Sequence, residues 1–225
     1  MTTHPATAEA LKEITRKNMQ SIVQQRGTVA FPTHTGERIY MREFTKRSGL
    51  PADISRWQET VDAMLDGIDV DGPIYLMVDQ GYVHGGKTHR RPGMHIDGYW
   101  VPAIHAHHNP VPHHSVTPPR RDGMHIHAGS HDHGRHIHDS NWPIEAIILA
   151  SDVSACRAVT GVWDGVIGEG GDCSHIDVSG MSEVVMQAGI SYAGNVTMLH
   201  ESLPIAHDFL RTVVRLNVPG WAPTA

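Results

Sequence analysis

A histidine followed two positions later by an aspartate is the most informative pattern in this sequence. It occurs twice, at His95/Asp97 and at His175/Asp177. Side chains two positions apart on a strand point to the same face. Joined by a histidine from a distant strand, such a pair can hold Fe(II) from one side and leave the other side open to a co-substrate and oxygen. This arrangement is the 2-His-1-carboxylate facial triad, so the predicted chemistry is metal-centred.

The third ligand is expected near the end of the chain. Residues 195–200 predict a strand that ends at His200, and a second predicted strand at 210–218 carries Arg211 and Arg215. These two arginines share one face of that strand. A guanidinium inside a β protein needs a partner, and it pairs well with a planar carboxylate through two parallel hydrogen bonds.

Histidine is also concentrated in one stretch. Of the 19 histidines, fourteen lie between His84 and His138. Residues from about 102 to 141 are rich in proline and histidine, cannot bury much apolar surface, and predict a long loop. Three roles are open: a solvated loop, a lid over the iron, or a second metal site for Zn, Ni or Cu. The candidate ligands of that second site are His125, His127, His131, His133, His136 and His138.

Composition limits the class of protein. The chain has 225 residues, of which 40% are hydrophobic, and it predicts a single domain over residues 1–225. Its formal net charge of −6 argues against nucleic-acid or membrane-surface binding. No apolar run suits a membrane span and no secretory signal is visible, so we expect a cytoplasmic protein with a small-molecule substrate. Because Cys156 and Cys173 form no CxxC pair, we expect both to be free thiols.

The order of elements predicts helices first and strands afterwards. Residues 7–26 place Leu11, Ile14 and Ile22 on one helical stripe, and a second helix is predicted at 52–66. Residues 1–70 therefore predict a helical N-terminal scaffold. Short strands separated by glycine-containing turns follow, and they indicate an antiparallel sandwich or barrel. The predicted strands cover residues 37–44, 73–78, 94–101, 145–150, 158–163, 184–187, 195–200 and 210–218.

The order of His95, Asp97, His200 and Arg211 resembles the Fe(II)/2-oxoglutarate-dependent dioxygenase superfamily. The run HESLP that begins at His200, with Arg211 after it, is similar to the C-terminal half of the phytanoyl-hydroxylase-like branch. The resemblance covers roughly residues 75–219. It implies a mainly β fold, a double-stranded β-helix (a jelly roll, cupin-like) over 71–219, with the His-rich stretch as an insertion.

The resemblance also implies a role for each site residue. His95, Asp97 and His200 would hold Fe(II), and Arg211, with Arg215 as the alternative, would bind the far carboxylate of 2-oxoglutarate. The long stretch between Asp97 and His200 can hold the intervening strands, whereas the short stretch after the second His-x-Asp pair hardly can. The protein would then couple 2-oxoglutarate decarboxylation to hydroxylation of a small substrate.

Two other interpretations stay open. The chain could be a non-catalytic metal-binding β-sandwich, a structural or accessory protein whose His-rich loop sequesters Zn, Ni or Cu. It could also be a cupin-type metalloenzyme without 2-oxoglutarate, which would gather more histidines at one centre, such as His125 and His127. Tyr99, Trp100 and Trp163 are candidates for a pocket wall, although core packing is the simpler role for each of them.

Overall fold

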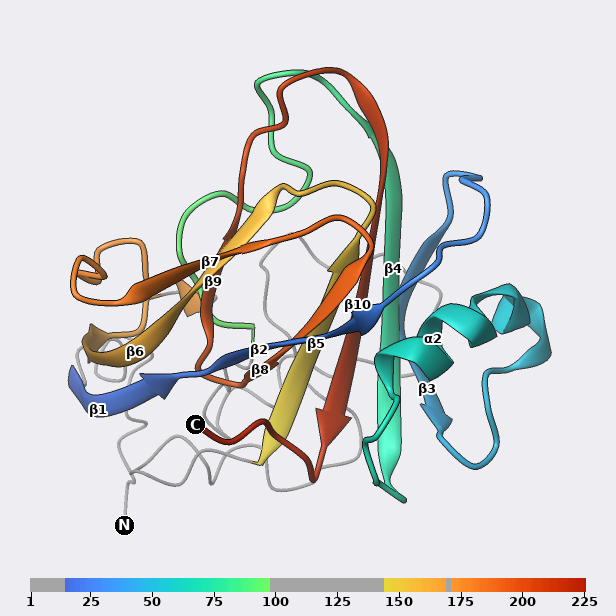
Figure 1. The fold of residues 1–225 in the computed structure, drawn as a ribbon, viewed down its shortest axis with the longest axis horizontal. Coiled ribbons are helices and arrows are strands. Elements are labelled where there is room, and N and C mark those ends of the chain that lie inside the picture. Colours follow the sequence, from blue (N-terminus) through green and yellow to red (C-terminus); the bar gives the residue numbers. More distant parts are fainter. Residues whose placement is uncertain (1–14, 98–143, 169–170) are drawn as a thin grey trace, which may run out of the picture.

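The computed structural model describes residues 15–97, 144–168 and 171–225 (Figure 1). Within these ranges the chain is mainly antiparallel β-structure, which confirms the predicted β class. One helical segment is present, made of η1 (Ala52–Trp57) and α2 (Gln58–Met64). The strands are β1 (Thr15–Ser21), β2 (Val23–Thr28), β3 (Arg38–Thr45), β4 (Pro73–Val83), β5 (Glu145–Ser151), β6 (Cys156–Val166), β7 (Ser182–Met186), β8 (Ile190–Asn195), β9 (Leu199–Ser202) and β10 (Phe209–Pro219).

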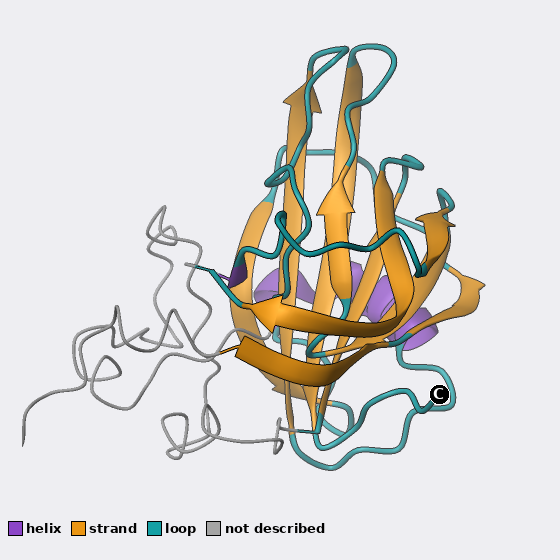
Figure 2. Cartoon of the chain, turned by 90° about the vertical axis from the view of Figure 1, so that its left-hand side faces the viewer, coloured by secondary structure: helices purple, strands orange, loops and turns teal. Residues whose placement is uncertain are grey.

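The strands form two sheets that face each other (Figure 2). The larger sheet has the order β2-β8-β5-β10-β4-β3, and the smaller one has the order β1-β6-β7, with β9 also paired to β6. Strands β4 and β10 are the longest antiparallel pair, running from Phe209 opposite Val83 to Asn217 opposite Tyr75. From β7 to β10 the consecutive strands alternate between the two sheets, so residues far apart in the sequence meet between the sheets.

The outer face of the larger sheet is covered by the helical segment. Trp57 and Val61 are fully buried there, against Leu76, Ile148 and Leu216 of the sheet. The helical segment therefore belongs to the core on the far side of the sheet from the site. Its position agrees with the helix predicted at 52–66.

The inner face of the larger sheet carries polar side chains as well as apolar ones. Alternation along β10 turns Arg211, Val213, Arg215 and Asn217 inward, and all four are buried. Fully burying charged side chains is costly unless they are paired and hydrogen-bonded. The space between the sheets therefore holds a cluster of buried polar side chains as well as an apolar core.

In the part that the structure describes, the expected helical scaffold over residues 1–70 is wrong outside the helical segment at 52–64. Residues predicted to continue a helix up to 26 form β1 and β2 instead, while Leu11 and Ile14 lie outside the described residues. Met19 and Ser21 are buried and Gln20 is exposed, which is the two-residue period of a strand. Pairing of β1 with β6 and of β2 with β8 outweighs the weak helical stripe.

The predicted strands other than 94–101 each overlap an observed strand, and β8 was missed by the sequence analysis. The strand predicted at 94–101 is described only up to residue 97, and this part forms isolated β-bridges through His95 instead of a strand. Residues 98–101 lie outside the described ranges. In the part of the chain that the structure describes, no helix is long and apolar enough to cross a membrane.

The buried carboxyl group of Glu145 should make the free energy of unfolding depend on pH. Burial raises its pKa from 4.5 to about 7, although Asn217 donates a hydrogen bond to it at 2.9 Å. The folded chain therefore keeps a proton that the unfolded chain loses, so the free energy of unfolding falls as pH rises from 4.5 towards 7, by up to about 3 kcal/mol. Glu145→Gln keeps the acceptor without the charge and should remove this loss. Urea unfolding at about pH 5 and about pH 8 measures it, and an equal gap between variant and wild type at both pH values contradicts it.

Candidate metal centre

The site is organised by a cross-strand pair of histidines. His95 and His200 form an antiparallel bridge, in which each backbone amide donates to the other residue's carbonyl oxygen, at 3.0 and 3.1 Å. Residues directly opposite in such a pair project from the same face of the sheet. The two rings consequently lie together, with their centroids 4.5 Å apart. A second bridge, from His95 to Asp172, fixes the other edge of this segment.

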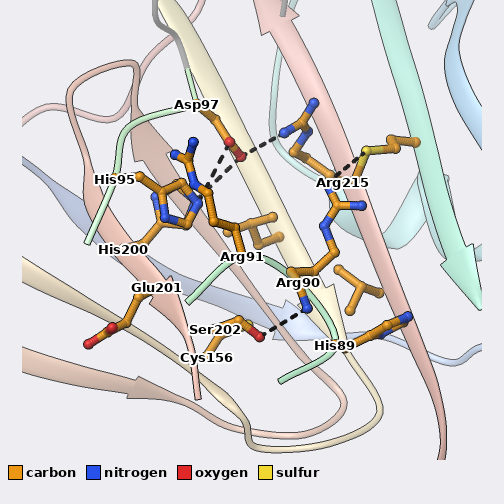
Figure 3. Close-up of a pocket in the computed structure, with 13 residues that line it drawn as sticks. His89, Arg90, Arg91, His95, Asp97, Cys156, His200, Glu201, Ser202 and Arg215 are labelled. Atoms are coloured by element: carbon orange, nitrogen blue, oxygen red, sulfur yellow. Dashed lines mark hydrogen bonds and ion pairs between the residues drawn. The ribbon is translucent and has the colours of Figure 1, made fainter. Parts of the chain in front are cut away.

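Asp97 completes the cluster from two positions beyond His95 (Figure 3). One ligand atom from each of His95, Asp97 and His200 lies within 4.8 Å of the others, a group that could hold a metal ion. Nε2 of His200 is 3.3 Å from Oδ2 of Asp97, and Nε2 of His95 is 3.9 Å from Oδ1. The structure thus brings together the three residues that the sequence analysis selected as ligands.

Backbone carbonyls set the tautomer of both rings. Nδ1 of His95 donates to the carbonyl of Gly93 at 2.8 Å, and Nδ1 of His200 donates to the carbonyl of Met198 at 3.0 Å. Because a carbonyl only accepts, the proton of each neutral ring is on Nδ1 and the lone pair is on Nε2, the atom that faces Asp97. Hydrogen bonds of this kind orient the histidine ligands of metal sites. Gly93 has a φ of +82°, a conformation that glycine adopts without strain.

Burial keeps the imidazole of His95 neutral. Removal from water, followed by the neighbouring His200 ring, lowers the pKa of His95 to about 3. His95 and His200 are 7% and 5% exposed. At neutral pH His95 therefore offers a lone pair rather than a positive charge, which a metal ligand requires.

The two candidate arginines of β10 occupy different places. Arg215 is buried and its Nη1 donates to Oδ2 of Asp97 at 2.6 Å, a charge-assisted hydrogen bond that orients the carboxylate. Arg211 is also buried, and its guanidinium donates to the carbonyl of Ala155 at 3.2 Å and to Oγ of Ser202 at 3.4 Å. Arg215 therefore acts on the cluster, whereas Arg211 lies behind it.

A pocket of about 280 Å³ opens beside the cluster. His95, Asp97, His200 and Arg215 line it, together with Cys156, Ser202 and Glu201. Three further lining residues, His89, Arg90 and Arg91, were not selected from the sequence as site residues. Their signal was available in the run HRRPGMHID, which places them directly before the His-x-Asp pair.

Other residues named in the sequence analysis lie elsewhere. His175 is exposed, and Asp177 accepts a hydrogen bond from the Ser179 amide at 2.9 Å, as expected of a turn. Trp163 packs in an apolar cluster of the smaller sheet rather than in the pocket. Both cysteines are free thiols, as predicted. Tyr99, Trp100 and the candidate second-metal ligands His125, His127, His131, His133, His136 and His138 lie outside the described residues.

The chain matches no protein-family model, no curated protein and no solved structure. The function proposed below therefore depends on the site itself.

If the cluster of His95, Asp97 and His200 binds a divalent ion, that ion should stabilise the folded protein. A metal that binds the native state alone raises the free energy of unfolding, by about 2.7 kcal/mol at a hundredfold excess over Kd. Adding Mn(II), a redox-stable substitute for Fe(II), should raise the Tm of the wild type and leave that of His200→Ala unchanged. His175→Ala removes an exposed histidine of the other His-x-Asp pair and serves as the matched control, so it should keep the full shift. An equal shift in wild type and His200→Ala contradicts the assignment.

Proposed function

We propose that this protein is a non-haem Fe(II) oxygenase that couples the oxidative decarboxylation of 2-oxoglutarate to the hydroxylation of a small substrate. The observation that carries this proposal is the convergence of His95, Asp97 and His200 within 4.8 Å. Two neutral imidazoles and one carboxylate are the protein ligands of a facial-triad Fe(II) site. The donor set of the cluster therefore fits Fe(II), and three protein ligands leave positions for a co-substrate and oxygen.

The strand order supports a double-stranded β-helix as the scaffold. The strands β8-β5-β10-β4 form the centre of the larger sheet, and the bridge to His200 joins residues 94–96 to β9, β6 and β7 in the smaller one. Four segments in each of two facing sheets are the arrangement of a jelly roll. In this arrangement the His-x-Asp segment and β9 are neighbours, which is why the ligands meet.

The chain's own residues hold the ion and set its open side. His95 and His200 offer Nε2, because their Nδ1 protons are held by backbone carbonyls. Arg215 fixes the carboxylate of Asp97 through Oδ2. Bound Fe(II) would supply the redox chemistry in which 2-oxoglutarate and O2 give succinate, CO2 and an oxygen atom for a substrate C–H bond.

Arg211 is the residue we propose for the far carboxylate of 2-oxoglutarate. Arg215 is the weaker candidate because it is already bonded to Asp97 at 2.6 Å. Arg211 touches Ser202 and Cys156, at 3.4 and 3.2 Å, and both of these line the pocket. Binding a carboxylate there requires Arg211 to exchange one of these long contacts for two charge-assisted hydrogen bonds, which are stronger.

The pocket limits the size of the substrate. Its volume of about 280 Å³ is near the lower end of the range of ligand pockets, roughly 300–1,000 Å³. A small molecule fits this volume, and a macromolecule would have to present a single side chain or base.

Release of succinate tests the proposal. Wild type with Fe(II), 2-oxoglutarate and oxygen should release succinate above the rate without enzyme, and His200→Ala should not, because it lacks a ligand. His175→Ala should match the wild type. Arg211→Lys should raise KM for 2-oxoglutarate about tenfold or more with a smaller change in kcat, because it loses the bidentate contact.

Equal turnover in the wild type and His200→Ala contradicts the oxygenase assignment. Metal analysis of protein purified without an affinity column then separates the alternatives. Several Zn or Ni ions per chain favour a non-catalytic metal-binding protein. One metal ion without 2-oxoglutarate turnover favours a cupin-type metalloenzyme of another kind.

A further inference from the structure

The wall of the pocket carries an excess of positive charge. Arg90, Arg91 and Arg215 line it, whereas Asp97 and Glu201 are its only lining carboxylates among the described residues. Both carboxylates are already neutralised by arginines. Arg215 pairs with Asp97 at 2.6 Å, and Arg157, which lies outside the lining, pairs with Glu201 at 2.5 Å.

The second layer does not remove this excess. Asp79 lies behind Arg90 and accepts a hydrogen bond from its Nη1 at 2.8 Å. Arg211 adds a further positive charge behind Ser202. The whole chain carries a formal net charge of −6, so the cationic pocket is a local feature of an acidic protein. A pocket wall in which arginines outnumber carboxylates favours ligands of negative charge.

Hydrogen bonds from the backbone hold residues 87–95, the segment that carries His89, Arg90 and Arg91, in place beside the metal ligands. This segment lies alongside residues 200–205. The amide of Ile205 donates to the carbonyl of Lys87, and the amide of Arg90 donates to Oγ of Ser202 at 3.4 Å. The amide of Gly93 donates to Glu201 at 3.1 Å, and the segment ends in the bridge between His95 and His200. The arginines and the metal ligand His95 are therefore parts of one fixed segment.

Arg91 and His89 stand at opposite ends of this wall. In Figure 3 the side chain of Arg91 reaches towards Asp97 and the imidazoles. The His89 side chain is 7% exposed, and its Nδ1 has no hydrogen-bond partner among the described residues. Buried polar atoms are rarely left without a partner, so an unsatisfied nitrogen in a pocket wall indicates a polar ligand.

We propose that His89, Arg90 and Arg91 form an oxyanion-binding wall, and that the substrate is a small molecule that bears a carboxylate or phosphate group. This inference rests on the proposed function, whose co-substrate has its own place at the metal and at Arg211. The two negative charges of 2-oxoglutarate cancel the two positive charges of the metal ion. The guanidinium groups of Arg90 and Arg91 line the pocket beside the metal ligands, where an anionic group of the substrate can accept hydrogen bonds from them. Planar guanidinium groups bind such oxyanions through paired hydrogen bonds.

Inorganic phosphate is the probe for this wall. The full chain, loaded with Mn(II) and saturated with 2-oxoglutarate, is titrated with phosphate at low ionic strength, and the relaxation of the phosphate ³¹P signal by Mn(II) is measured. Mn(II) does not turn over, so binding is seen without reaction. Acetate, followed by its ¹³C signal, is the carboxylate probe. We expect saturable relaxation by Mn(II), which requires the oxyanion to lie close to the metal.

Arg91→Gln is the main variant. Losing one charge-assisted contact should weaken phosphate binding about tenfold or more. Binding of 2-oxoglutarate should stay unchanged, which also shows that the variant is folded. Arg90→Gln should weaken phosphate in the same direction. Arg47→Gln removes one positive charge from the exposed turn after β3 and should bind phosphate as the wild type does.

The outcomes separate this inference from the proposed function. If 2-oxoglutarate binds but the wild type shows no saturable phosphate or acetate relaxation, the anionic substrate is wrong and the oxygenase proposal stands. If Arg91→Gln loses 2-oxoglutarate together with phosphate, the wall serves the co-substrate and the inference is overturned. If 2-oxoglutarate does not bind and phosphate binding still depends on Arg91, the oxyanion site stands and the proposed function is wrong.

Discussion

The reciprocal hydrogen bonds between the backbones of His95 and His200 are the interaction on which the site depends. They join a segment that follows β4 to a strand near the end of the chain, and they set the register that makes the two imidazoles direct neighbours. If one of the two segments shifted by one residue, its ring would turn to the opposite face and the two imidazoles would no longer be neighbours. Asp97 and Arg215 add to a geometry that this backbone pairing has already determined.

The inner face of the larger sheet shows a conflict between stability and function. Arg211, Arg215, Glu145 and Asn217 are all buried between the sheets, where apolar side chains of similar volume would often be as stabilising or more so. Their partners are polar groups of the chain itself, such as Asp97 for Arg215 and Asn217 for Glu145. A cluster of buried charge beside a pocket is understandable as binding machinery, because a charge acts more strongly where water is excluded.

Local patterns predicted most of the strands and the residues that form the cluster, and failed where long-range pairing decides. The His-x-Asp spacing and the strand that carries Arg211 and Arg215 are local, so they could be read from the sequence. Residues 15–28 have a weak helical stripe, and only their partners β6 and β8 make them strands. The wall of His89, Arg90 and Arg91 was missed because its position follows from contacts with residues 200–205, which no local pattern reveals.

The central claim is that His95, Asp97 and His200 hold one metal ion. A crystal of the full chain grown with Mn(II), with diffraction data collected near the manganese absorption edge, tests it most directly. We expect an anomalous difference peak within bonding distance of Nε2 of both histidines and of one oxygen of Asp97. An ordered manganese peak bound elsewhere in the chain, with these three side chains left without one, would contradict it.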